Sequence, residues 1–209
     1  MQNRRSALAA LGVFALAAPA LTAANLPRQA PDFAVNLNNG KQATLKQYQG
    51  KVVALIFILT ACPHCQKTVR CLIREQDEFG ARGFQALGSA IEPMAQINLP
   101  EFIRQFKPTF PVGYNPQRPV LDFMQHVPMV GPLMPLLAFI DRQGKIRAQY
   151  EGNDPFLAED QMEKNIREKI AALLEEGGPA PPGKRPTKKT GAPGKKQTIS
   201  QPPAVSSQP

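Results

Sequence analysis

Between residues 30 and 176, runs of apolar residues alternate with segments in which apolar positions recur every three or four residues. The run "VVALIFIL" at 52–59 is rich in β-branched side chains, which predicts a strand buried on both faces. The run "FQALGSAI" at 84–91 predicts a second buried strand. Between them, residues 65–83 have apolar side chains at helical spacing and end at a glycine, which predicts a helix.

Shorter patterns continue this alternation of strands and helices. Apolar and polar residues alternate at 32–37, which predicts a strand, and residues 135–152 predict a hairpin that turns at Gln143-Gly144. The other expected elements are a strand at 110–114 and helices at 99–106, 120–125 and 157–176. Strands that alternate with helices indicate an α/β domain with a mixed central sheet flanked by helices.

The first 24 residues have the features of a secretory signal peptide. Two arginines precede the apolar run "ALAALGVFALAA", which is too short to span a bilayer comfortably, and small residues allow cleavage after Ala20 or Ala24. An uncleaved signal anchor is the alternative, and the paired arginines also fit a twin-arginine signal that lacks the usual flanking residues. In each case the domain at 25–176 is expected in the periplasm or otherwise outside the cytoplasm.

Residues 177–209 are rich in Pro, Gly, Lys and Ser and contain no aromatic residue, so we predict a disordered tail. The tail contains six basic residues and no acidic one, and the signal contains two more arginines. Of the net charge of +9, only about +1 therefore remains for residues 25–176. A nearly neutral domain gives no reason to expect nucleic-acid binding. The basic tail either contacts an anionic membrane or cell-wall surface or keeps the protein soluble.

All three cysteines of the chain lie in "LTACPHCQKTVRC" at 59–71. Cys62 and Cys65 bracket Pro63 and His64 at the point where the predicted strand is followed by the predicted helix. Unpaired N–H groups and the positive end of the dipole at a helix N-terminus favour a thiolate at the first cysteine. The pair therefore lies where a reactive sulfur is expected.

Three interpretations of this pair have different requirements. A zinc site needs four ligands, normally from two such pairs, and only Cys71, His64 and His126 remain to supply them. A structural disulfide across so short a loop stabilises little. A redox-active pair explains the position, the spacing and an oxidising compartment together, and we adopt this interpretation. Cys71 is then expected to be a half-buried helix residue that packs as a small apolar group, with an intermolecular or regulatory disulfide as its alternative role.

Three spaced motifs resemble the TlpA-like/redoxin (AhpC/TSA-related) branch of the thioredoxin superfamily. "PDFAVNLNNGKQATLKQYQGKVVALIFILTAC" at 31–62 is similar to the opening of that family, and "FIDRQGKI" at 139–146 is similar to its late hairpin. Pro135 lies where the family has a cis-proline. The resemblance covers about residues 30–176 and implies a thioredoxin-like fold and thiol–disulfide exchange.

The resemblance also implies roles for individual residues. Cys62 would be the nucleophile, Cys65 the resolving thiol and His64 an active-site residue. Pro63 and Met134 would contact the substrate, which can pair with the Met134 backbone as an added strand. Exported protein thiols and disulfides would be the substrates, and a membrane redox protein would recycle the dithiol. No cofactor is expected.

The chain departs from the family pattern at several positions. Ala61 stands where tryptophan is common, and Met134 stands where threonine usually precedes the cis-proline. Ile56 stands where relatives often have a polar or acidic residue that helps to deprotonate the second cysteine. These changes disfavour a vigorous reductase. Leu55 and Leu59 replace the proline and threonine of a peroxidatic motif, so a peroxidase is not expected.

The dipeptide Pro63-His64 resembles the centre of DsbA-type disulfide oxidases. A histidine there can donate to the Cys62 thiolate or place positive charge near it. Either effect stabilises the reduced form and makes the disulfide a stronger oxidant. We therefore predict a reduction potential between the reference values of about −270 mV for thioredoxin and about −120 mV for DsbA.

A copper-binding or copper-delivery protein is the competing function. Methionines and a histidine gather just ahead of the expected cis-proline, and thioether, imidazole and thiolate are soft ligands suited to Cu(I). The residues concerned are Met124, His126, Met129 and Met134, together with the dithiol of Cys62 and Cys65. Alternatively, the methionines fill gaps at the rim of the active site or form an apolar surface for unfolded substrates.

Overall fold

Strand β4 (Val52–Ile58) lies in the middle of the sheet of the computed structural model, which describes residues 25–127 and 129–177. Strand β4 pairs in parallel with β5 (Phe84–Ala90) and antiparallel with β7 (Leu136–Ile140). All seven side chains of β4 are buried, because strands flank both of its edges and helices cover both of its faces. The predicted signal peptide, and all but the first residue of the predicted tail, lie outside the described residues.

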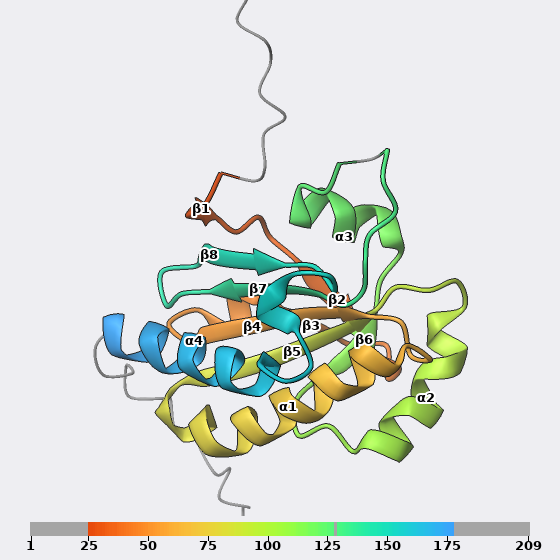
Figure 1. The fold of residues 1–209 in the computed structure, drawn as a ribbon. Helices are drawn as coiled ribbons and strands as arrows, with labels where there is room; N and C mark the ends of the chain where they lie inside the picture. Colours follow the sequence, from red (N-terminus) through yellow and green to blue (C-terminus); the bar gives the residue numbers. More distant parts are fainter. Residues whose placement is uncertain (1–24, 128, 178–209) are drawn as a thin grey trace, which may run out of the picture.

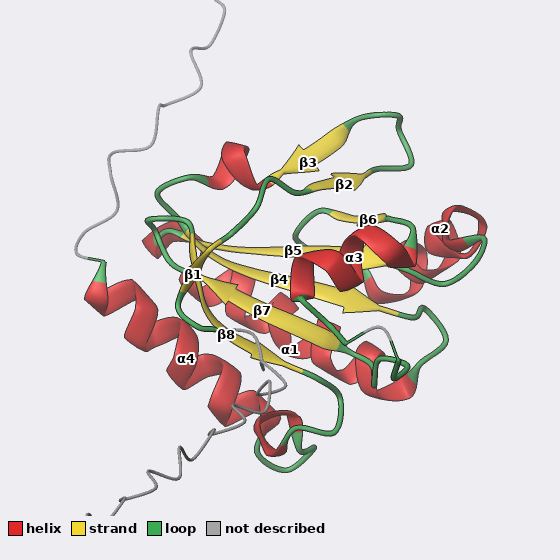
Figure 2. Ribbon diagram, turned by 90° about the horizontal axis from the view of Figure 1, so that it is seen from above, coloured by secondary structure: helices red, strands yellow, loops and turns green. Residues whose placement is uncertain are grey.

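Within the described residues the sheet has eight strands in the order β1-β8-β7-β4-β5-β6-β2-β3 (Figure 2). The remaining strands are β1 (Arg28–Gln29), β2 (Ala34–Asn36), β3 (Gln42–Thr44), β6 (Val112–Tyr114) and β8 (Lys145–Tyr150). Strands β4, β5 and β6 run parallel to one another, and the other neighbouring pairs are antiparallel. The predicted mixed sheet is therefore confirmed. Strands β7 and β8 form the predicted hairpin, and Gly144 in its turn has a φ of 78°.

The helices cover both faces of the sheet (Figure 1). They are α1 (Pro63–Phe79), α2 (Ala95–Phe106), α3 (Gln117–Met124) and α4 (Met162–Glu176). Helices α1, α2 and α4 pack on the face that carries Ile56 and Ile58 of β4, and α3 packs on the face that carries Leu55 and Phe57. This alternation along β4 buries the strand completely, and the predicted α/β arrangement is confirmed.

Several boundaries differ from the sequence-based expectation. The closing helix was expected from residue 157, but α4 begins at Met162, because the 3-10 turn η3 (Pro155–Leu157) and a further turn precede it. Helix α2 begins at Ala95, one turn before the expected start, and includes Pro100. The short strands β1 and β3 were not expected. The pairing of β1 depends on the distant β8, whereas β3 pairs with the neighbouring β2 across the turn at 37–41. None of the described helices is long and apolar enough to cross a membrane.

Candidate active site at the start of helix α1

Cys62 caps the N-terminus of α1, and its Sγ accepts a hydrogen bond from the backbone N–H of Cys65 at 3.3 Å. Pro63 follows in the first helical turn, where its missing N–H costs no helical bond. The first N–H groups of a helix lack partners within the helix, so they can stabilise negative charge on a sulfur at this position. All three cysteines, including Cys71, are free thiols. The predicted position of the pair between a buried strand and a helix is confirmed.

The two sulfurs of the pair differ in environment. Cys62 is partly exposed, whereas Cys65 is fully buried. Burial and, secondly, the hydrogen bond to Cys62 raise the pKa of the Cys65 thiol. At neutral pH the structure therefore offers one accessible sulfur at a helix terminus and one shielded, protonated thiol beneath it. This asymmetry is what a nucleophile and a resolving thiol require.

His64 lies between the cysteines, and its Nε2 is 2.9 Å from the carbonyl oxygen of Leu157 in η3. A carbonyl oxygen can only accept a hydrogen bond, so we assign the proton to Nε2. This bond directs the Nε2 donor toward the segment before α4 rather than toward Cys62. The hydroxyl of Thr68 donates to the backbone carbonyl of His64 at 2.9 Å and fixes the same turn from within the helix.

The peptide bond between Met134 and Pro135 is cis, as the resemblance implied. Pro135 is buried, and the half-buried Met134 packs against the same apolar cluster as Cys62. Gly152 fixes this segment from the other side, because its N–H donates to the carbonyl oxygen of Leu133 at 2.7 Å. A Cβ atom on Gly152 would lie only 2.1 Å from the carbonyl oxygen of Met134, so the absence of a side chain permits the contact.

His126 makes a different contact from the one that copper binding would require. Its Nε2 is 3.3 Å from a carboxylate oxygen of Glu151, and its side chain is only 6% exposed. Among the described residues, no group of three His, Cys, Asp or Glu side chains is arranged to hold a metal ion. The structure therefore does not join His126 to Cys62 and Cys65 in a metal site.

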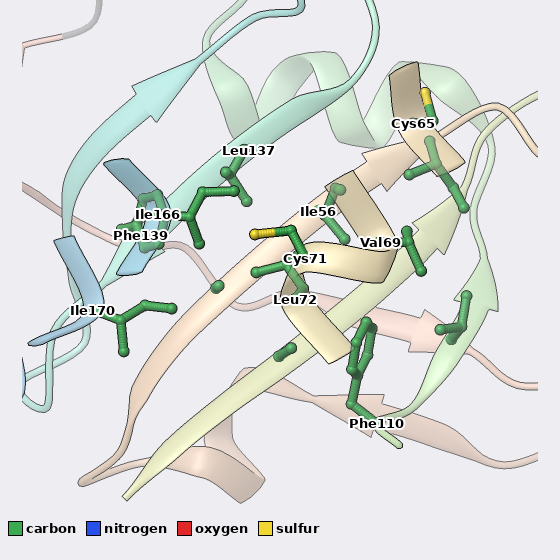
Figure 3. Packing of buried hydrophobic residues seen from close by; sticks show 14 of the residues in the cluster. Ile56, Cys65, Val69, Cys71, Leu72, Phe110, Leu137, Phe139, Ile166 and Ile170 are labelled. Carbon is green, nitrogen blue, oxygen red and sulfur yellow. The ribbon is translucent and has the colours of Figure 1, made fainter. Parts of the chain in front are cut away.

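Cys71 was expected to be half-buried, and this is wrong because the side chain is fully buried. It lies in the cluster that includes Ile56 of β4 and Ile166 of α4, where α4 packs beside α1 on the same face of the sheet (Figure 3). Burial and, secondly, the neighbouring Glu75 raise the pKa of Cys71 to about 12. A protonated thiol in this position packs as a small apolar group.

Sequence patterns alone did not identify two residues at the site. One is Gly152, and the other is Glu92, whose carboxylate accepts hydrogen bonds from the backbone N–H and the hydroxyl of Thr60, two residues before Cys62. Glu92 follows β5, and the pairing of β5 with β4 brings it beside the active-site turn. The register of that pairing is the signal that could have located it.

This combination of a mixed α/β sheet, a helix-capping dithiol and a cis-proline segment defines the class of thiol–disulfide oxidoreductases. The family model described as "AhpC/TSA family" matches residues 26–149, and the chain belongs to that family.

Known proteins support the same class. The chain is 32% identical over 143 residues to the thiol-disulfide oxidoreductase ResA of Geobacillus thermodenitrificans, an alignment that covers 67% of this chain and 78% of the relative. It is 29% identical over 117 residues to ResA of Bacillus subtilis, and this alignment covers 56% of this chain and 62% of that relative. A thiol:disulfide interchange protein of the thioredoxin family from Chlorobium tepidum superposes with a TM-score of 0.60 at 20% identity, over 71% of this chain and 97% of that one. The fold is therefore thioredoxin-like, and the protein is a protein thiol–disulfide oxidoreductase.

Proposed function

We propose that this protein is an exported thiol–disulfide oxidoreductase that exchanges disulfides with protein substrates through Cys62 and Cys65. The observation that carries the proposal is the arrangement of the two sulfurs. The Cys62 sulfur is partly exposed and accepts the Cys65 N–H at a helix N-terminus, whereas Cys65 is buried beneath it. A substrate can reach the first sulfur directly, and the second sulfur can react only with the first.

In the reducing direction, the Cys62 thiolate attacks one sulfur of a substrate disulfide. A mixed disulfide forms, and the other substrate sulfur leaves with the electron pair of the broken bond. Cys65 then loses its proton and attacks the Cys62 sulfur, which releases the second substrate thiol and leaves a Cys62–Cys65 disulfide. Two electrons pass from the dithiol to the substrate. The reverse sequence oxidises a substrate dithiol and returns Cys62 and Cys65 to the reduced form.

The raised pKa of Cys65 supports this division of labour, because a protonated and buried thiol does not compete with Cys62 for the substrate. Ile56, fully buried in the same cluster, supplies no carboxyl group that could take the Cys65 proton. Resolution of the mixed disulfide is therefore expected to be slow. Slow resolution favours the capture of substrates as covalent intermediates.

His64 makes the Cys62–Cys65 pair more oxidising in this proposal. The Nε2–H of His64 donates to the Leu157 carbonyl oxygen. A proton on Nδ1 would add positive charge within the first turn of α1 without breaking that bond. Positive charge near a helix N-terminus favours the thiolate of the reduced form, so the Cys62–Cys65 disulfide becomes more oxidising. A membrane redox protein outside the cytoplasm would recycle the pair.

Protein substrates would bind along the cis-proline segment. The backbone edge at Met134 is suited to pair with an extended substrate, and Pro63 is exposed beside Cys62. The apolar loop, which we define as residues 127 and 129–133, runs directly into Met134. Its four large side chains are exposed by 44% (Val127), 94% (Met129), 63% (Val130) and 50% (Leu133). A substrate that lies across Met134 would cover them and bury apolar surface.

The proposal is tested by disulfide exchange with insulin or reduced ribonuclease. Cys62→Ser is expected to abolish turnover, and Cys71→Ala, which leaves the pair intact, is expected to retain it. Cys65→Ala is expected to accumulate mixed disulfides with exported proteins in cells, and these can be identified by mass spectrometry. Turnover by Cys62→Ser, or recovery of the protein only from the cytoplasm, would contradict the proposal.

A further inference from the structure

The active-site sulfur depends on a four-residue turn between β4 and α1. The N–H of Cys62 donates to the carbonyl oxygen of Leu59 at 3.1 Å, which closes a turn over residues 59–62. Strand β4, on one side of this turn, is completely buried and cannot shift freely. The position of the Cys62 sulfur relative to the first turn of α1 is therefore decided by the conformation of Thr60 and Ala61.

Side chains from two other elements hold the peptide groups on either side of Thr60. The N–H of Thr60 donates to Oε1 of Glu92 at 3.1 Å, and its hydroxyl makes a short hydrogen bond to the same oxygen. On the opposite side, Nε2 of Gln66 in the first turns of α1 donates to the Thr60 carbonyl oxygen at 2.9 Å. Both backbone polar groups of Thr60 are thus bound by side chains. The turn cannot rotate about this residue without breaking these bonds.

Glu92 reaches the turn because β5 continues beside β4 past its last paired residues. The N–H of Ile91 donates to the carbonyl oxygen of Ile58 at 3.0 Å, so the next residue of each strand is brought alongside the other. The bond from Thr60 to the Glu92 side chain therefore continues the parallel pairing of β4 and β5 beyond their last backbone hydrogen bond. The completely buried central part of the sheet thereby fixes the turn.

Neither core stability nor charge accounts for a carboxyl group at this place. Oε2 of Glu92 is buried and has no hydrogen-bond partner among the described residues, which is unfavourable for a carboxylate. A negative charge two residues from Cys62 also opposes a thiolate there. The favourable element of the arrangement is the pair of bonds to Thr60.

We propose that Glu92 is a positioning residue for Cys62. It holds Thr60 so that the Cys62 sulfur stays within reach of the Cys65 N–H at the start of α1. This inference deepens the proposed function, because it adds a residue that acts on the nucleophile through the turn. The acceptor oxygen of Glu92 is the required feature, and its charge is not.

Two substitutions separate the acceptor from the charge. Glu92→Gln keeps an oxygen that can accept both Thr60 bonds, and Glu92→Leu removes the acceptor at similar size. The readout is the rate of Cys62 alkylation by iodoacetamide in reduced full-length protein at pH 6.5, divided by its plateau rate at alkaline pH. We expect Glu92→Leu to lower this ratio about tenfold. That is the effect of one lost hydrogen bond to a charged group, here the bond from the Cys65 N–H to the Cys62 thiolate. Glu92→Gln is expected to keep the wild-type ratio or to raise it, since it removes a repelling charge.

If Glu92→Gln and Glu92→Leu shift the alkylation ratio equally and in the same direction, the charge matters and the proposal is overturned. An unchanged ratio in Glu92→Leu would also overturn it. If Glu92→Leu fails to fold, as judged by circular dichroism, Thr60→Val decides the question. It removes only the hydroxyl bond at a partly exposed position and is expected to lower the ratio about two- to threefold. No change in a folded Thr60→Val would also overturn the proposal. Alkylation needs no protein substrate, so these results are independent of whether the protein exchanges disulfides with insulin or ribonuclease.

Discussion

The imidazole of His64 donates from Nε2 to the carbonyl oxygen of Leu157, 2.9 Å away, and this bond ties the residue between the two cysteines to the turn before α4. The bond persists whether the ring is neutral or protonated, because Nε2 carries a proton in both forms. His64 is therefore fixed in place while its charge can vary. A fixed residue with a variable charge beside a helix N-terminus is suited to adjust the stability of a thiolate.

Replacing His64 with proline is expected to lower the reduction potential of the Cys62–Cys65 pair by tens of millivolts, at about 30 mV per 1.4 kcal/mol. The reason is that proline cannot place positive charge in the first turn of α1, as a histidine there can. Equilibration with a glutathione redox buffer measures the potential. His64→Gln is the matched control, since its amide can still donate to Leu157 but cannot become charged. It is expected to show most of the same decrease. A wild-type potential at or below that of thioredoxin would contradict the oxidant assignment.

Alkylation of the reduced protein at pH 6 is expected to modify Cys62 first. Cys62 is the accessible sulfur, whereas burial raises the pKa of both Cys65 and Cys71. Since the thiolate is the reacting species, the two buried residues should be labelled only after denaturation. Peptide mass spectrometry after brief exposure to iodoacetamide identifies the modified residue. Earlier labelling of Cys65 or Cys71 would show that the roles of the cysteines are assigned wrongly.

Gly152→Ala is expected to destabilise the protein by about 1–3 kcal/mol and to slow exchange with protein substrates. The new Cβ would lie 2.1 Å from the carbonyl oxygen and 2.5 Å from the carbonyl carbon of Met134, so the cis-proline segment must move. Gly131→Ala is the matched control, because among the described residues, its two chain neighbours apart, no atom lies within 4 Å of its Cβ position. It should change stability by no more than about 0.5 kcal/mol. Denaturant unfolding compares the two variants, and equal effects would argue against a role for the close contact.

Alkaline pH is expected to destabilise the fold through Cys71. Its pKa is about 12 in the folded protein and about 9 when unperturbed, so between these values the folded state binds more protons than the unfolded state. The free energy of unfolding should therefore fall as pH rises above about 9, by up to about 1.4 kcal/mol per pH unit. Urea unfolding between pH 8 and 10.5 measures the slope. Cys71→Ala should make the slope shallower, although Cys65 adds a contribution of the same sign. An unchanged slope in Cys71→Ala would contradict this expectation.

Polar substitutions in the apolar loop are expected to weaken exchange with protein substrates only. The double variant Met129→Ser/Val130→Ser removes two strongly exposed apolar side chains next to the cis-proline segment. Its kcat/KM for reduced ribonuclease should fall about tenfold, mostly through KM, whereas its rate with a small disulfide should not change. Met94→Ser/Ile97→Ser in the region of α2 is the matched control, with similar exposure of 62% and 61%. If the double variant instead loses binding to lipid vesicles while its KM is unchanged, the apolar loop would be assigned to contact with a lipid surface.

Local patterns predicted the elements that local chemistry decides. The β-branched run of β4, the helical spacing of α1 and the turn at Gln143-Gly144 each depend on neighbouring residues, and each is present in the structure. The pair Cys62 and Cys65 was placed correctly because it lies at the junction of two such elements.

Features that depend on distant partners were missed. Glu92 and Gly152 are polar or small residues in loops, and only strand pairing gives them a position beside Thr60 and Met134. The start of α4 was misplaced for a related reason. The apolar spacing continues through Leu157, but that residue belongs to a 3-10 turn whose carbonyl binds the His64 ring.

The connection between β1 and β2, residues 30–33, runs between two strands that lie toward opposite ends of the sheet order. Phe33 in this connection packs against Phe57 of β4 and Phe123 of α3, with ring centroids 5.4 and 5.0 Å apart. Among the described strands β1 pairs with β8, far along the chain, whereas β2 pairs with the neighbouring β3 and, at Asn36, with β6. The first described strand, β1, therefore reaches its final position only after the last one, β8, is available for pairing.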